Sequence, residues 1–240
     1  MILEIKEINK FYGKKNILND VSLKFYPNQV YGLFGINGAG KSTLAKCIFN
    51  EVKKSDNSIF IDDHLINIHN YEEMYYFLDN PDLPKEMLVY DYLSKLNLLA
   101  NNDMKKFKKQ VVELGQELLP NVNIKKKRIK NLSSGQQKLV SLMGCILLRP
   151  KIIFFDEPTA NLDLKNKELI LSSIMKIKNS DNIIVFMTHL IEEIAPYIDQ
   201  MIILNNHKII YDAPVKSDER NKLKTIFLES IRKDNKQQGE

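Results

Sequence analysis

The sequence predicts an α/β fold in which a mostly parallel sheet is flanked by helices, with an N-terminal antiparallel β subdomain and an inserted α-helical subdomain. Residues 151–158 and 182–189 are short, continuously apolar runs with helical patterns on either side. Such runs are typical of central parallel strands that are covered on both faces. The N-terminal part instead alternates between apolar and polar residues, and from residue 71 to about 130 the pattern becomes helical.

The composition is that of an ordinary globular protein. The 240 residues are 44% hydrophobic and 27% charged, enough for one large domain or two small ones with a sizeable core. The net charge of +5 indicates a lysine-rich, solvated surface. Residues 125–128 form the densest basic run, and we interpret it as a solvated loop in preference to a nucleic-acid patch. No nucleic-acid partner is therefore expected.

The cysteines and the hydropathy pattern indicate the compartment. Cys47 and Cys145 stand among apolar neighbours without metal-ligand spacing, so we expect buried thiols in a reducing environment. No N-terminal signal is evident, and no uncharged apolar stretch is long enough to span a bilayer. These features predict a cytoplasmic chain.

The N-terminal elements follow from periodicity. In residues 21–27 apolar and polar side chains alternate, which predicts a half-buried strand. Residues 29–35 predict a more buried strand, and residues 41–52 a helix. After a polar turn, residues 59–66 predict another strand.

The later elements divide the chain. Residues 201–214 predict a hairpin that turns at Asn205 and Asn206, which tolerate positive φ. Residues 222–234 predict an amphipathic helix, followed by a frayed tail. The predicted divisions are residues 1–78 and 135–215 for two parts of one core, 79–134 for the helical subdomain, and 216–240 for a C-terminal helix and tail.

Residues 35–43, GINGAGKST, fit the pattern G-x-x-x-x-G-K-[ST] between an apolar strand and a helix. Glycines let successive backbone N–H groups turn inward around phosphate oxygens, and the following helix directs its positive end there. We expect Lys41 to reach the β- and γ-phosphates, Ser42 to bind Mg²⁺ and Thr43 to contact the α-phosphate. The segment thus predicts a nucleoside triphosphate site built from Gly35, Asn37, Gly38, Ala39, Gly40, Lys41, Ser42 and Thr43.

Two carboxylates and a histidine follow apolar strands. Asp156 ends the apolar strand predicted within residues 151–158. This position places it at the carboxyl edge of the sheet, where it can hold Mg²⁺. Glu157 is then free to activate a water molecule as a general base. His189 ends the neighbouring strand, and we expect it to contact the γ-phosphate.

The stretch LSSGQQK, residues 132–138, opens an apolar helix with a polar cluster. One serine could cap the helix, but a cap explains only one of these polar residues. With the motifs above, the stretch resembles the signature segment of the ATP-binding subunit of an ABC transporter, with Ser134 where glycine is commoner. Residues 160–163, ANLD, resemble the D-loop of that family, and His189 its switch histidine. Tyr12 stands where the family places an adenine-stacking aromatic, and Phe11 could be the core residue of the pair, or the two roles could be reversed.

The resemblance covers nearly the whole chain and implies how the polar cluster is used. In this family two ATPase subunits close head to tail, and each signature segment covers the ATP held by the other subunit. The signature contacts would come from Ser133, Ser134, Gly135 and Gln136, with Asp163 in the D-loop. The implied ligands are ATP and Mg²⁺. The implied partners are a second ATPase subunit, identical or a paralogue, and integral membrane permease subunits that hold the chain at the inner face of the cell membrane.

One position departs from the family pattern. Asp79 stands where a glutamine is usual, and we expect it to be either a Mg²⁺ ligand or a turn cap before Pro81. The sequence Asp-Asn-Pro at 79–81 resembles exporters for antibiotics and bacteriocin-like peptides, which favours export. Apolar residues at 87–92 predict a groove for a permease helix, with ordinary core packing as the alternative.

Two other functions compete with transport. A non-transport ABC-type ATPase is the first alternative, although the chain has a single ATPase core and no long heptad repeat. A small P-loop kinase is the second, but that function leaves the signature and D-loop residues unexplained. The transported substrate is not encoded in the motifs of this chain.

Overall fold

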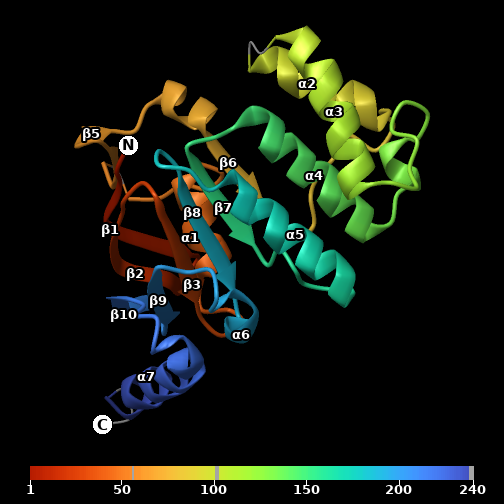
Figure 1. The fold of residues 1–240 in the computed structure, drawn as a ribbon. Coiled ribbons are helices and arrows are strands. Elements are labelled where there is room, and N and C mark those ends of the chain that lie inside the picture. The colour runs from red at the N-terminus through yellow and green to blue at the C-terminus, as the bar shows by residue number, and fades with distance from the viewer. Residues whose placement is uncertain (56, 101–102, 238–240) are drawn as a thin grey trace. The chain divides into compact units, whose positions relative to one another are not determined.

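The computed structural model describes residues 1–55, 57–100 and 103–237 and divides into two compact units. The first unit comprises Met1–Tyr76, Lys151–Glu157 and Asn179–Glu240, and the second comprises Phe77–Pro150 and Pro158–Lys178. Figure 1 labels the elements along the chain. Each unit is described separately below.

An antiparallel sheet of four strands, in the order β2-β1-β4-β5, forms one part of the first unit. Its strands are β1 (Leu3–Tyr12), β2 (Lys15–Phe25), β4 (Ile59–Ile61) and β5 (His64–Leu65). The strand predicted at 59–66 is in fact this β4–β5 hairpin, so that prediction was wrong. Asp62 and Asp63 both have positive φ, 49° and 63°, and such a pair of residues reverses the chain between two strands.

A second sheet has six strands in the order β10-β9-β3-β8-β7-β6. They are β3 (Gln29–Phe34), β6 (Met74–Phe77), β7 (Ile152–Asp156), β8 (Ile183–Thr188), β9 (Gln200–Asn205) and β10 (Lys208–Pro214). β8 pairs in parallel with both β3 and β7, and β9 pairs in parallel with β3. All residues of β7 and β8 are buried, as their continuous apolarity predicted. The predicted α/β fold with a mostly parallel sheet is confirmed.

Two details of this sheet differ from the sequence-based expectation. The β9–β10 hairpin turns at Asn206 and His207, with φ values of 43° and 71°, one residue later than predicted, because Asn205 is still part of β9. β6 lies inside the region expected to be helical. Its four residues are too few for a strand pattern to stand out.

Aromatic side chains pack the core of the first unit. Phe25 lies edge to face against Tyr31, with ring centroids 4.8 Å apart, and against Phe154, at 5.8 Å. These residues come from β2, β3 and β7, so one core joins the antiparallel and the parallel sheets. Cys47 is buried in the same core as a free thiol.

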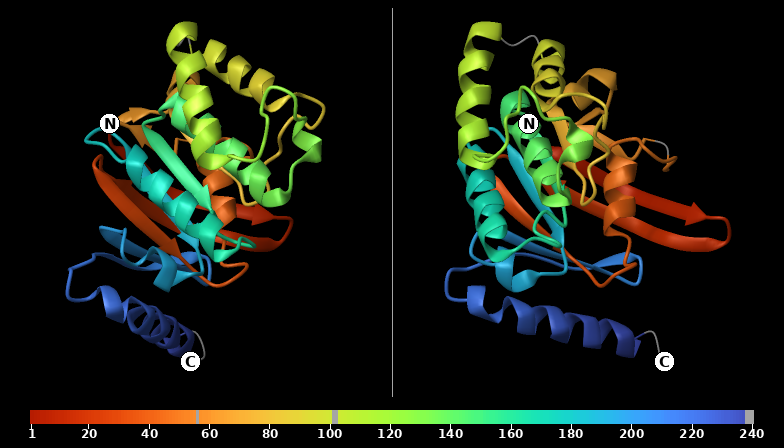
Figure 2. Two further views of the ribbon diagram at one scale, coloured as in Figure 1. Left: turned by 45° about the vertical axis from the view of Figure 1, so that its right-hand side comes forward. Right: turned by 90° about the vertical axis from the view of Figure 1, so that its right-hand side faces the viewer.

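The remaining elements of the first unit are helical. They are α1 (Lys41–Ile48), η1 (Ile68–Glu73), α6 (Ile191–Ile194), η3 (Arg220–Lys222) and α7 (Leu223–Gln237). α7 contacts β9 and β10, and Figure 2 shows it running beside them. The predicted C-terminal helix at 222–234 is present and continues to Gln237, so the expected frayed tail was wrong for residues 235–237. Residues 238–240 of that tail lie outside the described residues.

The second unit is helical and larger than the predicted subdomain at 79–134. It contains α2 (Val89–Leu99), α3 (Met104–Leu118), η2 (Ile129–Asn131), α4 (Ser134–Leu148) and α5 (Leu164–Ile177). α4 packs against α2, α3 and α5, which is why α4 and α5 group with the helical unit and not with the core. No helix in the described part of the chain has both the length and the apolar character needed to cross a membrane.

The end of α4 offers a test of local strain. Arg149 is in the left-handed conformation (φ 52°, ψ 52°) immediately before Pro150. A side chain in this conformation costs about 1 kcal/mol relative to glycine. We expect Arg149→Gly to raise the free energy of unfolding by about 0.5–1 kcal/mol, measured by urea denaturation.

Lys178 at the end of α5 is the matched control, because its φ is −54°. Glycine at this position adds freedom to the unfolded chain and relieves no backbone strain, so Lys178→Gly should lower stability by at least about 0.5–1 kcal/mol. Equal destabilisation by both variants would contradict the strain at Arg149.

Candidate active site

The phosphate loop joins β3 to α1 in the first unit. Gly38 and Gly40 have φ values of 82° and 113°, in the region that disfavours side chains. A Cβ atom on Gly40 would also lie only 2.8 Å from the carbonyl oxygen of Ile17. Gly40 is the N-cap of α1 and provides no side-chain hydrogen bond to the helix. The first-turn N–H groups of α1 are thus available for an anion.

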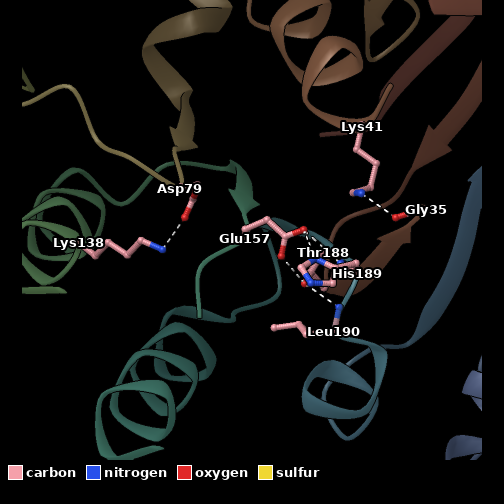
Figure 3. Close-up of polar contacts among 8 residues, drawn as sticks. All are labelled: Gly35, Lys41, Asp79, Lys138, Glu157, Thr188, His189 and Leu190. Carbon is pink, nitrogen blue, oxygen red and sulfur yellow. Dashed lines mark hydrogen bonds and ion pairs between the residues drawn. The ribbon is translucent and has the colours of Figure 1, made fainter. Parts of the chain in front are cut away.

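Lys41 is buried at the start of α1, with 7% exposure. Its Nζ donates a 2.7 Å hydrogen bond to the carbonyl oxygen of Gly35 (Figure 3). Burial lowers the pKa of Lys41, and the nearby carboxylates of Glu157 and Asp156 oppose that shift. A bound phosphate would place a full negative charge in contact with this amine, in place of the neutral carbonyl oxygen of Gly35.

A cavity of about 350 Å³ opens beside the loop. It is lined by Lys15, Ile17, Asn37, Gly38, Ala39, Gly40, Lys41, Ser42, Thr43, Asp156 and Glu157. The fold thus brings the predicted loop residues and both predicted carboxylates together around one cavity. Gly35 accepts the bond from Lys41 instead of lining the cavity. Lys15 and Ile17 were missed by the sequence reasoning, because only the packing of β2 places them here.

Asp156 is the last residue of β7 and is 7% exposed. The hydroxyl of Tyr76 donates to its Oδ2 at 3.0 Å. Burial raises the pKa of Asp156, and hydrogen bonds from Ser42 and Tyr76 oppose the shift. The same environment raises the pKa of Tyr76, by its burial and by the charge of Asp156. Tyr76 was missed because it belongs to β6, the strand that the sequence did not reveal.

The donor set around Asp156 fits Mg²⁺. The hydroxyl of Ser42 bonds to the carboxylate of Asp156, so two oxygen ligands of the kind that Mg²⁺ prefers lie together in the cavity. Mg²⁺ commonly takes one or two protein oxygens and completes its shell with water and substrate phosphate. Ser42 and Asp156 would hold the ion, which would neutralise charge on the phosphates. Among the described residues, no group of three or more His, Cys, Asp or Glu forms a metal site of its own.

Glu157 lies in a left-handed backbone conformation, with φ 44°, directly after β7. Its Oε2 accepts a 2.7 Å bond from the Thr188 hydroxyl. Its Oε1 lies 2.8 Å from Nδ1 of His189 and accepts the His189 backbone N–H at 3.2 Å (Figure 3). Two predicted site residues from different strands therefore meet. Thr188 was missed, although its position before His189 at the end of β8 was visible in the sequence.

The contacts fix the Glu157 carboxylate from several directions. The Thr188 Oγ1 also accepts a hydrogen bond from the backbone N–H of Leu190 at 3.0 Å. This contact orients the hydroxyl group that donates to Glu157. Strained backbone at such a residue is typical of functional sites. A carboxylate held in this way beside a phosphate cavity can accept a proton from water.

Tyr12 and Phe11 lie at the end of β1 and are 48% and 54% exposed. The expectation that one of the pair is a core residue was wrong, because in this part of the hairpin both rings point away from the core. Lys10 places its amine 4.7 Å from the centre of the Tyr12 ring. Adenine stacking on Tyr12 stays a prediction.

In the second unit, Ser133 is the N-cap of α4. Its Oγ accepts the Gln136 backbone N–H at 3.2 Å, and the Gln136 side chain accepts the Ser133 N–H at 3.1 Å. This reciprocal capping box occupies two of the four predicted signature residues. Ser134 is exposed, and a Cβ atom on Gly135 would lie 3.0 Å from Cδ2 of Leu162.

Asp163 and Asp79 also have partners within the second unit. Asp163 caps α5, and hydrogen bonds from Asn166 hold its pKa below the usual value. Asp79 accepts a 2.8 Å bond from Nζ of Lys138 (Figure 3). Its predicted role as a Mg²⁺ ligand remains a prediction, but one of its oxygens has a cationic partner in this structure.

A model of the ABC transporter family matches residues 18–160. A putative ABC transporter ATP-binding protein of Mycoplasma pneumoniae is 28% identical over 242 residues, covering 97% of this chain and 74% of the relative. The methionine import ATP-binding protein MetN of Clostridioides difficile is 29% identical over 223 residues, covering 87% of this chain and 67% of MetN. A solved ATP-binding subunit of an ABC transporter has the same fold, with a TM-score of 0.83 at 22% identity over 96% of this chain and 99% of that one. The chain belongs to the ABC transporter family, as an ATP-binding subunit that hydrolyses ATP for a transport system.

Proposed function

We propose that the chain powers membrane transport by closing as a dimer on ATP and opening after hydrolysis. The observation that carries the proposal is the position of Glu157, which lines the phosphate cavity while Thr188 and His189 hold its carboxylate. A cavity for phosphate without such a carboxylate would bind a nucleotide but provide no base for its hydrolysis.

The residues of the cavity have separate tasks in this proposal. Lys41 exchanges its bond to Gly35 for the β- and γ-phosphates, where its charge is stabilised. Glu157 accepts a proton from the attacking water as the oxygen of that water bonds to the γ-phosphorus. The bond from the γ-phosphorus to the bridging oxygen breaks, and ADP keeps that oxygen. His189, hydrogen bonded to Glu157, contacts the γ-phosphate.

Dimer closure uses the second unit. The capping box satisfies Ser133 and Gln136 without a ligand, while the exposed Ser134 and the start of α4 offer a hydroxyl and the positive helix end. We propose that these residues, with Gly135 and Asp163, contact the ATP of a second ATPase subunit, either the same chain or a paralogue. ATP then acts as a bridge whose loss on hydrolysis opens the dimer.

Permease subunits are the proposed membrane partner. A groove of about 530 Å³ in the second unit is lined by Glu86, Met87, Leu88, Asp91, Ser94, Lys95 and Arg128. Of the residues expected to line it, Met87 and Leu88 do so, whereas Val89 is fully buried in the core. An amphipathic permease helix fits a groove that is lined by both apolar and charged side chains. This docking would hold the chain at the inner face of the membrane.

Export is the proposed direction. The Asp-Asn-Pro sequence at 79–81 supports it through its resemblance to exporters of antibiotics and bacteriocin-like peptides. MetN is named for import, so sequence similarity alone does not favour export. The direction therefore needs a test of its own.

Glu157→Gln tests the mechanism. Glutamine keeps the size of the side chain but cannot accept the proton, so turnover should fall about 10²- to 10⁴-fold while ATP binding persists. With Mg²⁺ and ATP the variant should accumulate as a dimer in light scattering after gel filtration. Glu113→Gln, an exposed change on α3, is the control and should behave like the parent. Near-normal hydrolysis by Glu157→Gln would remove Glu157 from its role.

Asp156→Asn tests the electrostatics. Because burial raises the pKa of Asp156, this carboxyl keeps its proton to a higher pH in the native protein than in the unfolded chain, so stability falls as the pH rises through that interval. Asparagine avoids that cost: its Oδ1 can accept one of the two hydroxyl bonds, and its Nδ2 can donate to the oxygen of the other hydroxyl. We expect the nucleotide-free variant to melt a few degrees higher at pH 7.5, by about 2–4 °C, although hydrolysis is lost.

The gain in melting temperature should shrink as the pH is lowered through the raised pKa of Asp156, because the carboxyl is then neutral in the native protein as well. A variant that melts lower than the parent at pH 7.5 would contradict the cost assigned to this buried carboxylate.

The export prediction concerns cells that carry Glu157→Gln in place of the native chain. If the complex exports toxic compounds, these cells should show a lower minimal inhibitory concentration for antibiotic peptides than the parent, with no new nutrient requirement. A nutrient requirement that added nutrient relieves would show import instead. Cells with Glu113→Gln provide the control.

A further inference from the structure

Lys138 is a buried cation in the helical unit. It lies one turn after the start of α4, and its side chain is 4% exposed. Its Nζ donates a 2.8 Å bond to Oδ1 of Asp79 and a 2.9 Å bond to the carbonyl oxygen of Ala160 (Figure 3 draws the pair with Asp79). A buried ammonium group needs such acceptors, because removing it from water costs several kcal/mol.

The two acceptors come from segments that are far apart in the sequence. Asp79 lies in the segment that follows β6, and Ala160 begins the D-loop before α5. Lys138 therefore connects three stretches of the second unit. The packing of Gly135 against Leu162 joins the signature segment and the D-loop a second time.

The pair is asymmetric in its exposure. The side chain of Asp79 is 34% exposed, whereas that of Lys138 is almost completely buried. Solvent can stabilise the carboxylate if Lys138 is removed, but very little solvent reaches the ammonium group if Asp79 is neutralised. The asymmetry indicates that Lys138 depends on the charge of Asp79 more than Asp79 depends on the charge of Lys138.

We propose that Lys138 is a positioning residue of the signature segment, with Asp79 as its counter-ion and the Ala160 carbonyl as its second acceptor. By this contact the start of α4, the D-loop and the segment after β6 move as one body. The proposal rests on the proposed function, because the signature segment acts on the ATP of a second subunit. It also assigns Asp79 a task other than binding Mg²⁺.

A melting cycle tests the pairing without nucleotide. Asp79→Asn removes the carboxylate charge next to the buried ammonium group of Lys138 and should lower the Tm by roughly 6 °C or more. Lys138→Met removes the charge at similar length and should cost less. The double variant should melt higher than Asp79→Asn alone, because it has no buried charge. Additive losses, or a larger loss for Lys138→Met than for Asp79→Asn, would overturn the assignment of Asp79 as counter-ion.

Dimer formation tests the positioning role below these melting temperatures. In a Glu157→Gln background, Lys138→Met should raise the ATP concentration needed for half-maximal dimerisation roughly three- to thirtyfold. The ATP affinity of the dilute monomer should stay within about twofold, since the phosphate loop belongs to the other unit. Lys138→Arg, which keeps the charge, should restore most of the dimerisation. Unchanged dimerisation by Lys138→Met would overturn the proposal.

Lys176→Met is the matched control, because Lys176 pairs with Glu117 at an exposed position of the same unit. It should shift the Tm by less than about 2 °C and leave dimerisation unchanged. Mg²⁺ titrations separate the two tasks of Asp79. A raised Mg²⁺ requirement in Asp79→Asn, together with normal dimerisation by Lys138→Met, would make Asp79 a metal ligand and contradict the proposal.

If the Glu157→Gln parent itself fails to dimerise with Mg²⁺ and ATP, the proposed function fails and the signature role of Lys138 falls with it. The melting cycle needs no nucleotide, so it still decides whether Asp79 and Lys138 are coupled. The two failures are therefore distinguishable.

Discussion

The parallel pairing of β8 with β3 on one side and β7 on the other is the constraint on which the catalytic unit depends. Its register aligns Phe34 with Thr188 and Asp156 with Met187, so the three strands end at one edge of the sheet. Parallel strands place their carboxyl ends together, and the chain that leaves each of them must turn there. The phosphate loop begins directly after β3, Glu157 directly follows β7, and His189 directly follows β8.

The buried edge also determines the electrostatics of the site. Burial lowers the pKa of Lys41 and raises that of Asp156, so desolvation works against the charge on both residues. Groups of the chain itself stabilise these charges, namely the Gly35 carbonyl for Lys41 and the Tyr76 hydroxyl for Asp156. Such contacts are weaker than those with a triphosphate and a divalent cation. The site is therefore held together by bonds that a ligand can replace.

In the helical unit, residues that we propose for recognition of the second subunit's ATP also stabilise helix ends. Ser133 and Gln136 cap α4 for each other, and Asp163 caps α5. Caps satisfy the helix ends when no partner is present, yet they leave hydroxyl groups and first-turn N–H groups near the surface. This explains why an apolar helix can begin with a polar cluster. The bonds of the buried Lys138 to Asp79 and to the Ala160 carbonyl join α4 to two other segments of the unit.

A feature of the structure could be predicted when a long enough run of neighbouring residues carries its pattern. Strand and helix periodicity predicted β3, β7, β8, α1 and α7, and it failed for the short β6 and for the β4–β5 hairpin. A hairpin within eight residues is decided by two Asp residues in a left-handed conformation, which outweigh an apolar pattern too short to be distinctive.

In the candidate site, too, some residues could be identified from local sequence and others only from the tertiary structure. The phosphate loop, Asp156, Glu157 and His189 could be named from the sequence, because their chemistry follows from a local motif or from the end of an apolar strand. The roles of Tyr76, Thr188 and Lys138 could not be predicted from the sequence. Each of these residues bonds to a partner that lies 31 to 80 positions away along the chain. Local composition determines which groups stand at the ends of elements. Only the tertiary structure, by choosing which strands and helices lie side by side, decided which of those groups hold one another in place.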